Sequence, residues 1–202
     1  MNAPAMNRRD YRALQAAAEE LHSTDRDYRR AVNLDFLVYV ISVVLIALSL
    51  RAFIGEPVRV DGPSMLPTLQ DTEYMLAEKV SYYFHPPERG DIAIVFYPGF
   101  TVSCVKRVIA LPGERISIFD GKVYINGEEL DESEYWNDYI EGNMQELTVP
   151  ENTIFVMGDN RNISGDSRMS EVGPIPFEKV LGKVTLVMWP FGSFRTITHG
   201  VY

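Results

Sequence analysis

The chain has one cysteine, few histidines and no excess of positive charge. In 202 residues the single cysteine, Cys104, excludes an intramolecular disulfide and any cysteine-based zinc cluster. The formal net charge of −9 argues against nucleic acid as the main partner, because binding to phosphates requires clustered lysine and arginine. HExxH metal-binding and glycine-rich nucleotide-binding motifs are also missing from the sequence, so we expect neither a metal nor a cofactor.

The three histidines give little support to a histidine-based active site. His22 precedes a long apolar run, His85 lies in the turn-like stretch FHPPERG, and His199 is close to the C-terminus. A Ser-His-Asp triad depends on folding rather than on sequence spacing, so His85 remains an open candidate for a catalytic base.

One long apolar run stands near the N-terminus. Residues 36–50, FLVYVISVVLIALSL, carry no charge, and with Arg51 and the next three residues they approach the ~20 residues needed to cross a bilayer. A buried helix of a soluble protein and a cleavable signal peptide are the alternatives. The 35 preceding residues are too long for a standard n-region, so we predict an uncleaved signal anchor over residues 34–56.

Basic residues next to the anchor predict its orientation. Three arginines (Arg26, Arg29 and Arg30) precede the uncharged run of residues 36–50, and two (Arg51 and Arg59) follow that run. The excess before the anchor favours a cytoplasmic N-terminus and an extracytoplasmic C-terminal domain in the cell membrane. We therefore expect residues 1–33 to form a cytoplasmic helical segment, to which we assign no chemistry, and residues 57–202 to form the domain outside.

The C-terminal part has the texture of a β domain. It contains short runs rich in β-forming residues between turns: TEYMLAEKV, DIAIVFY, VSCVKRVIAL, RISIFDGKVYINGEEL, NTIFVMGD and VLGKVTLVMWP. The Asp-Gly and Asn-Gly pairs within residues 119–130 are strong hairpin signals. Residues 128–148 are acidic and weakly patterned, and we expect them to be an excursion from the core. The predicted fold class is mostly β, with a single N-terminal transmembrane helix followed by an antiparallel β domain.

A single serine stands in a rigid context in DGPSMLPTLQ, residues 61–70. Gly62, Pro63 and Pro67 restrict the backbone around Ser64. A turn alone would explain these residues, but a fixed hydroxyl is also what a nucleophile requires. A serine nucleophile further needs a base.

Lysine is the alternative base, and Lys106 is the candidate among five lysines. In SCVKRVIAL it shares one strand face with Cys104 and Val108, and burial on such a face lowers a lysine pKa by up to ~3–5 units. The other face carries Arg107 and Val105 together with Ile109, so alternation alone does not decide which face is the core. From the pattern alone, a lysine on the surface of the strand is the favoured interpretation.

A third polar stretch, MGDNRNISGDSR at residues 157–168, lies between two apolar runs. It fits a solvated turn, but long polar loops are also where function is often located. Its Gly-Asp-Ser sequence makes Ser167 a rival nucleophile of the trypsin type. Arg168 follows where that type has glycine, which argues against the rival.

Four stretches in order resemble the type I signal peptidases, membrane-anchored Ser-Lys proteases that remove signal peptides. They are SMLPTL (64–69), GDIAIVF (90–96), VKRVIALPGE (105–114) and MGDNRNISGDSR (157–168). The resemblance implies an antiparallel, β-barrel-like catalytic domain. It also implies cleavage of exported preproteins after small residues, typically Ala-x-Ala, with signal peptides and membrane lipid as partners; the oligomeric state is left open.

The resemblance assigns roles by position. Ser64 corresponds to the nucleophile and Lys106 to the general base, and the hydroxyl of Ser164 is expected to orient the Lys106 amine. Four charged residues are expected to support the site, Asp166 and Arg168 as an ion pair, with Asp159 and Arg161 supporting the loop. Met65 is expected to line the pocket for small residues.

Two positions depart from the family pattern. Where some members have a serine that stabilises the oxyanion, this chain has Gly62, which is similar to the Gram-positive enzymes and leaves the backbone N–H of Ser64 as the expected donor. Cys104 replaces an aromatic residue that is common there, so Lys106 is expected to be less shielded from water. Two rival functions are a self-cleaving repressor protease, disfavoured by the apolar run and the acidic charge, and an inactive anchored β domain that binds exported chains.

Overall fold

The computed structural model describes residues 8–53, 55–99 and 101–197, so His199 lies outside the described residues. The chain divides into two compact units, Met1–Ser49 and Leu50–Tyr202. The first unit consists of helix α1 (Arg8–Phe53), which continues into the start of the second.

Helix α1 is continuous because its 46 residues contain neither glycine nor proline. Its polar N-terminal part is therefore not separated from the apolar run by a break. By length and composition, the stretch Tyr11–Ser49 qualifies as a candidate membrane span. The prediction of a membrane-length apolar helix agrees with this finding, while the boundary at residues 33 and 34 stays a prediction.

The second unit is built around a curled antiparallel sheet. Its strands run in the order β1-β2-β11-β3-β4-β9-β10, and β12 pairs with β11. The strands are β1 (Glu56–Arg59), β2 (Tyr74–Glu78), β3 (Ile92–Phe96), β4 (Ser103–Ala110), β9 (Thr153–Met157), β10 (Ile175–Pro176), β11 (Val180–Trp189) and β12 (Arg195–Thr196). Three short helices lie between them, α2 (Ser81–Phe84), η1 (Phe177–Lys179) and η2 (Phe191–Ser193). The mostly β, antiparallel fold class is confirmed.

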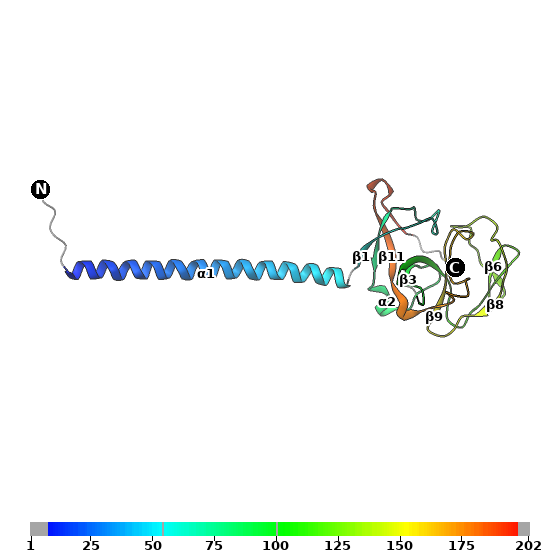
Figure 1. Ribbon diagram of the computed structural model, residues 1–202, viewed down its shortest axis with the longest axis horizontal. Helices are drawn as coiled ribbons and strands as arrows, with labels where there is room; N and C mark the ends of the chain where they lie inside the picture. The colour runs from blue at the N-terminus through cyan, green and yellow to red at the C-terminus, as the bar shows by residue number, and fades with distance from the viewer. Residues whose placement is uncertain (1–7, 54, 100, 198–202) are drawn as a thin grey trace. The chain divides into compact units, whose positions relative to one another are not determined.

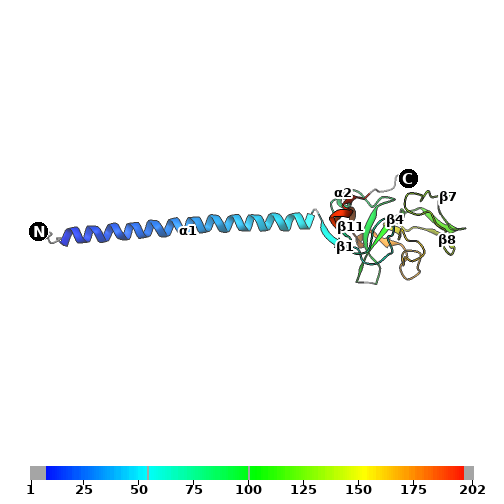
Figure 2. The ribbon, with the colours of Figure 1, turned by 90° about the horizontal axis from the view of Figure 1, so that it is seen from above.

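A smaller antiparallel sheet has the order β7-β6-β5-β8. It consists of β5 (Arg115–Phe119), β6 (Lys122–Ile125), β7 (Glu128–Glu129) and β8 (Met144–Thr148). Both predicted hairpins form: Asp120-Gly121 joins β5 to β6 and Asn126-Gly127 joins β6 to β7, all four residues having positive φ as in type I′ turns. In both ribbon views this sheet lies at the end of the domain away from β1 (Figures 1 and 2).

Apolar clusters cover both faces of β4. Val105 packs against the cluster that contains Met65, and Ile109 belongs to a cluster that also contains residues of the smaller sheet. Val108 and Cys104, on the other face, belong to or pack against a third cluster. Because both faces are covered, β4 buries side chains that point in opposite directions.

We predict that Ile109→Ala destabilises the domain by about 2–5 kcal/mol, because Ile109 is fully buried between the two sheets and alanine leaves a cavity. Ile163→Ala is the matched control: Ile163 is mostly exposed, and its substitution should change the free energy of unfolding by less than about 0.5 kcal/mol. Denaturant unfolding of the full chain in detergent measures both. Equal effects would contradict this description of the core.

Candidate active site

The site centres on one serine and one lysine that are 42 residues apart in sequence. Lys106 Nζ lies 2.7 Å from Ser64 Oγ, within hydrogen-bonding distance. Ser64 belongs to the irregular segment between β1 and β2, whereas Lys106 lies in the middle of β4, opposite Ala93 of β3. A regular strand thus presents the amine, and a turn presents the hydroxyl.

Local hydrogen bonds and two buried side chains hold the serine segment. The N–H of Leu66 donates to the carbonyl of Pro63 at 3.1 Å, and that of Leu69 donates to the carbonyl of Met65 at 2.9 Å. Met65 and Leu69 are both fully buried in the cluster beneath the segment. These contacts fix Ser64 between a turn and the core, which is the rigid setting that the prolines predicted.

The amine of Lys106 lies in a largely dry environment. The residue is 4 % exposed. This burial lowers the pKa of Lys106 below its ordinary value, since a low-dielectric surrounding disfavours the ammonium form. Nearby Cys104, Asp166 and Asp159 act in the opposite direction, and Arg168 acts in the same direction as burial. Burial, and not the neighbouring carboxylates, therefore lowers the pKa of Lys106 toward the neutral amine that a general base requires.

The polar loop 157–168 lies directly against the serine segment. The N–H of Asn160 donates to the carbonyl of Ser64 at 3.0 Å, and its Nδ2 donates to the carbonyl of Pro63 at 3.2 Å. Gly158 approaches so closely that a Cβ on it would lie 2.4 Å from the Ser64 carbonyl oxygen and 2.3 Å from Ser164 Oγ. Only glycine fits between these two serines.

Asp166 and Arg168 form the expected ion pair within this loop. Asp166 Oδ1 lies 2.7 Å from Arg168 Nε, and Asp166 Oδ2 also accepts from the N–H of Gly158 at 2.9 Å. Arg168 Nη2 donates to the carbonyl of Arg161 at 2.6 Å. The pair therefore closes the loop on itself beside the site.

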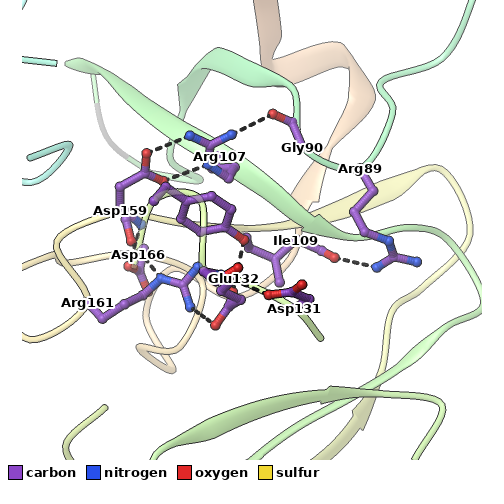
Figure 3. Close-up of polar contacts among 12 residues, drawn as sticks. Arg89, Gly90, Arg107, Ile109, Asp131, Glu132, Asp159, Arg161 and Asp166 are labelled. Carbon is purple, nitrogen blue, oxygen red and sulfur yellow. Dashed lines mark hydrogen bonds and ion pairs between the residues drawn. The ribbon is translucent and has the colours of Figure 1, made fainter. Parts of the chain in front are cut away.

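Asp159, in the polar loop, connects that loop to β4 and to the serine segment. It receives two hydrogen bonds of 2.7 Å from Arg107, the neighbour of Lys106 in β4 (Figure 3). The hydroxyl of Thr68, in the serine segment, also donates to it. Both members of the Arg107–Asp159 pair are buried. Breaking such a pair typically costs 3–5 kcal/mol, so the pair ties the segments together firmly.

Arg161 takes its partners from outside the loop and from the loop backbone. Its terminal nitrogens lie 2.7 and 2.5 Å from the two carboxylate oxygens of Glu132, and its Nε donates to the carbonyl of Gly158 at 3.0 Å (Figure 3). Glu132 comes from residues 128–148, the acidic stretch that the sequence suggested would leave the core. That stretch supplies β7 and β8 at its ends and is anchored between them by buried residues, including Glu132 and Tyr135.

Two expected roles, those of Ser164 and Met65, lack a direct counterpart among the contacts of the described residues. Ser164 Oγ donates to the carbonyl of Gly165 at 3.5 Å, and its expected bond to Lys106 stays a prediction. Met65 is 1 % exposed within the core cluster, and its contact with a substrate residue likewise stays a prediction. Gly62 has φ +89° and uses its N–H to donate to Asp71 Oδ1 at 2.9 Å.

The rival candidates lie in different surroundings. Ser167 is buried, and its Oγ accepts from the N–H of Val156 at 3.1 Å, so it serves the loop backbone. His85 is exposed at the end of α2. The site residues that the sequence did not reveal are Thr68, Asn160, Glu132 and Tyr135. Thr68 and Asn160 lie within stretches that the sequence had linked to function, whereas Glu132 and Tyr135 lie in the acidic stretch 128–148 that was expected to leave the core.

Comparison with known proteins gives consistent matches. The family model described as "Signal peptidase, peptidase S26" matches residues 33–189. The chain is 41 % identical over 169 residues to "Probable signal peptidase I-1" of Synechocystis sp., covering 76 % of this chain and 84 % of that protein. It is 38 % identical over 165 residues to "Signal peptidase I" of Bacillus licheniformis, covering 77 % and 88 %.

Two further matches extend this set. "Signal peptidase I T" of Bacillus subtilis is 34 % identical over 188 residues, covering 88 % of this chain and 97 % of that protein. A crystal structure of a signal peptidase I from Enterococcus faecalis is 34 % identical with a TM-score of 0.44, covering 50 % of this chain and 98 % of that chain. The similar sequences come from both a cyanobacterium and Bacillus species, so the Gram-positive-like variant stays a prediction.

We predict that Gly158→Ala slows labelling of Ser64 by a serine-directed acylating reagent by roughly 10- to 100-fold, since the added Cβ must displace Ser164 or the Ser64 carbonyl. Gly165→Ala in the same loop is the control, because its Cβ meets only the flexible side chain of Met169, at 3.2 Å. Mass spectrometry of the labelled chain gives both rates. Normal labelling of Gly158→Ala would show that the packing at Ser64 is looser than described.

Proposed function

Since this chain belongs to the signal peptidase family, peptidase S26, and is accordingly a serine endopeptidase, we propose that it removes signal peptides with a Ser64–Lys106 dyad. The observation that carries the proposal is the 2.7 Å separation between a buried lysine amine and a serine hydroxyl. Family membership supports the substrate class, and the geometry supports the identity of the two reacting groups.

The acylation step uses both groups. Neutral Lys106 accepts the proton of Ser64 while Oγ attacks the scissile carbonyl carbon, which gives a tetrahedral intermediate and a lysine ammonium. The ammonium then donates its proton to the leaving amine, the peptide bond breaks, and the mature protein departs. The signal peptide remains attached to Ser64 as an ester, and the lysine is neutral again.

Deacylation repeats the same transfers with water. Lys106 accepts a proton from water, the hydroxide attacks the ester carbonyl, and the ammonium returns the proton to Ser64 as the signal peptide leaves with a new carboxyl group. A single base therefore serves both halves of the reaction.

A backbone donor, the N–H of Ser64, is proposed to stabilise the oxyanion. The N–H of Gly62 is occupied by Asp71, so it does not serve this purpose. Among the hydrogen bonds of the described residues, none uses the N–H of Ser64, which leaves it for the substrate oxygen. Ser164 is proposed to orient the Lys106 amine, with Asp166, Arg168, Asp159 and Arg161 holding the loop around it.

Substrate and location follow from the family and from α1. We infer that an extended Ala-x-Ala segment of an exported preprotein binds along a strand edge, with Met65 beneath its small side chains. The apolar part of α1 is inferred to anchor the chain in the cell membrane, with residues 1–33 cytoplasmic and residues 57–202 outside. Ser64 follows the end of α1 by few residues, so cleavage would take place close to the membrane surface.

We predict that Ser64→Ala and Lys106→Met each abolish cleavage of a preprotein by the full chain in lipid vesicles, because one removes the nucleophile and the other its base. Lys79→Met is the control, since Lys79 forms only a partly exposed ion pair with Glu56 at 3.8 Å. Gel analysis of the cleaved preprotein measures all three. Persisting activity in Lys106→Met would end the dyad proposal, and persisting activity in Ser64→Ala would exclude Ser64 as nucleophile.

We also predict that kcat/KM rises with pH along an acidic limb whose midpoint lies below 10.5, the ordinary lysine pKa. Only the neutral amine accepts a proton from Ser64, and burial lowers the pKa of Lys106. Activity is therefore lost as pH falls through that lowered pKa. Rates of preprotein cleavage across the pH range give the midpoint, and a midpoint at or above 10.5 would contradict a buried lysine base.

A further inference from the structure

Glu132 and Tyr135 connect the smaller sheet to the polar loop 157–168 of the active site. Both lie in the segment between β7 and β8, and both are buried. The carboxylate of Glu132 accepts from both terminal nitrogens of Arg161, and Glu132 Oε1 also accepts from the Tyr135 hydroxyl at 3.1 Å. One carboxylate is thus fixed by the loop arginine and by its own neighbour in the segment.

The ring of Tyr135 contacts two buried guanidinium groups. Arg107 Cζ lies 4.1 Å from the ring centroid, and Arg161 Cζ lies 5.5 Å from it. Cation–π attraction is strongest when the cation is removed from water, as both of these are. Tyr135 therefore spans the distance between the strand that carries Lys106 and the loop that contacts Ser64.

Arg107 and Arg161 are each linked to a reacting group through one or two contacts. Arg107 is adjacent to Lys106 in β4, and it binds Asp159, which also accepts from Thr68 in the serine segment. Arg161 Nε holds the carbonyl of Gly158, the residue packed against the Ser64 carbonyl (Figure 3 shows both arginines).

We propose that Glu132 and Tyr135 are positioning residues for the Ser64–Lys106 reaction, acting by holding Arg161 and Arg107 in place. The inference rests on the proposed function. By fixing the loop at Gly158, which packs against the Ser64 carbonyl, the two residues keep Ser64 at its hydrogen-bonding distance from Lys106.

The chemistry of the cluster favours positioning over simple stabilisation. Buried ion pairs often contribute no more net stability than well-packed apolar residues of similar size. Such pairs restrict the orientation of the side chains, because a guanidinium whose two terminal nitrogens bind one carboxylate has few orientations available. Such a contact suits a loop whose Gly158 packs so closely against the Ser64 carbonyl that a Cβ would not fit there.

The test compares variants of the full chain in detergent with a preprotein substrate. Glu132→Gln and Tyr135→Leu should lower kcat by roughly 10- to 100-fold, with KM changed less than about threefold, because they displace the reacting groups and not the substrate. The rates are expressed per active site, counted by acylation of Ser64. Glu129→Gln is the matched control, since Glu129 forms a half-exposed pair with Lys122 and does not contact Arg161; its kcat should equal that of the wild type.

The pH profile separates positioning from loss of folded protein. A loosened loop admits water to Lys106, and since burial is the largest influence on its pKa, the acidic limb of kcat should move to higher pH. Asp166 and Asp159, which raise that pKa, and Arg168, which lowers it, all lie on the same loop, so their smaller effects partly offset one another. A purely structural role would reduce the number of active sites and leave the limb unchanged.

Each outcome decides the matter. If the wild type shows no Ser64-dependent cleavage, the proposed function fails independently of these variants. If the wild type is active and Glu132→Gln and Tyr135→Leu keep its kcat and acidic limb, or lose only active sites, the inference is wrong. Should those two variants not fold, Tyr135→Phe decides: it keeps the ring and loses the bond to Glu132, so a fall in kcat of about fivefold with a shifted limb is expected, and unchanged values overturn the proposal.

Discussion

The burial of one lysine amine against one serine hydroxyl is the constraint on which the site depends. An ammonium at this position would lose most of its hydration, so burial lowers the pKa of Lys106 below that of a lysine in water. Lys106 lies in the middle of an eight-residue strand that pairs with β3 over its first five residues and with β9 over its C-terminal half. The sheet thus fixes the amine in a dry position, and the turn containing Ser64 is brought to it.

The surrounding charges are arranged to keep this position intact. Arg107, Asp159, Arg161 and Glu132 are all buried, and each cation has a carboxylate at hydrogen-bonding distance. Removing one member would leave a buried charge without its partner, which is costly. One pair joins β4 to the polar loop 157–168, and the other joins that loop to the segment between β7 and β8. Charge pairing therefore joins these parts of the chain in addition to the apolar cluster that contains Ile109, Met157 and Ile140.

The predictions from sequence succeeded where the signal is local. The Asp-Gly and Asn-Gly turns specify type I′ hairpins by themselves, and alternating apolar runs marked β3, β4 and β9. A helical N-terminal segment and a membrane-length apolar run were likewise predicted, and α1 includes residues of both. By contrast, β8 and the anchoring of its preceding segment were missed, because Glu132 and Tyr135 look like surface residues until Arg161 and Arg107 are placed beside them.

The sequence by itself determined the classes of element, the order of the motifs and the residue types able to react. It did not determine whether Lys106 or Arg107 faces the core, since alternation along a strand gives two faces and does not say which is covered. The tertiary structure decided that both are buried, because apolar clusters lie on each side of β4. One face of the strand directs the lysine to Ser64, and the other directs the arginine to Asp159. Distances between segments far apart in the chain arise only from packing, and so does the contact that makes a serine and a lysine into a reacting pair.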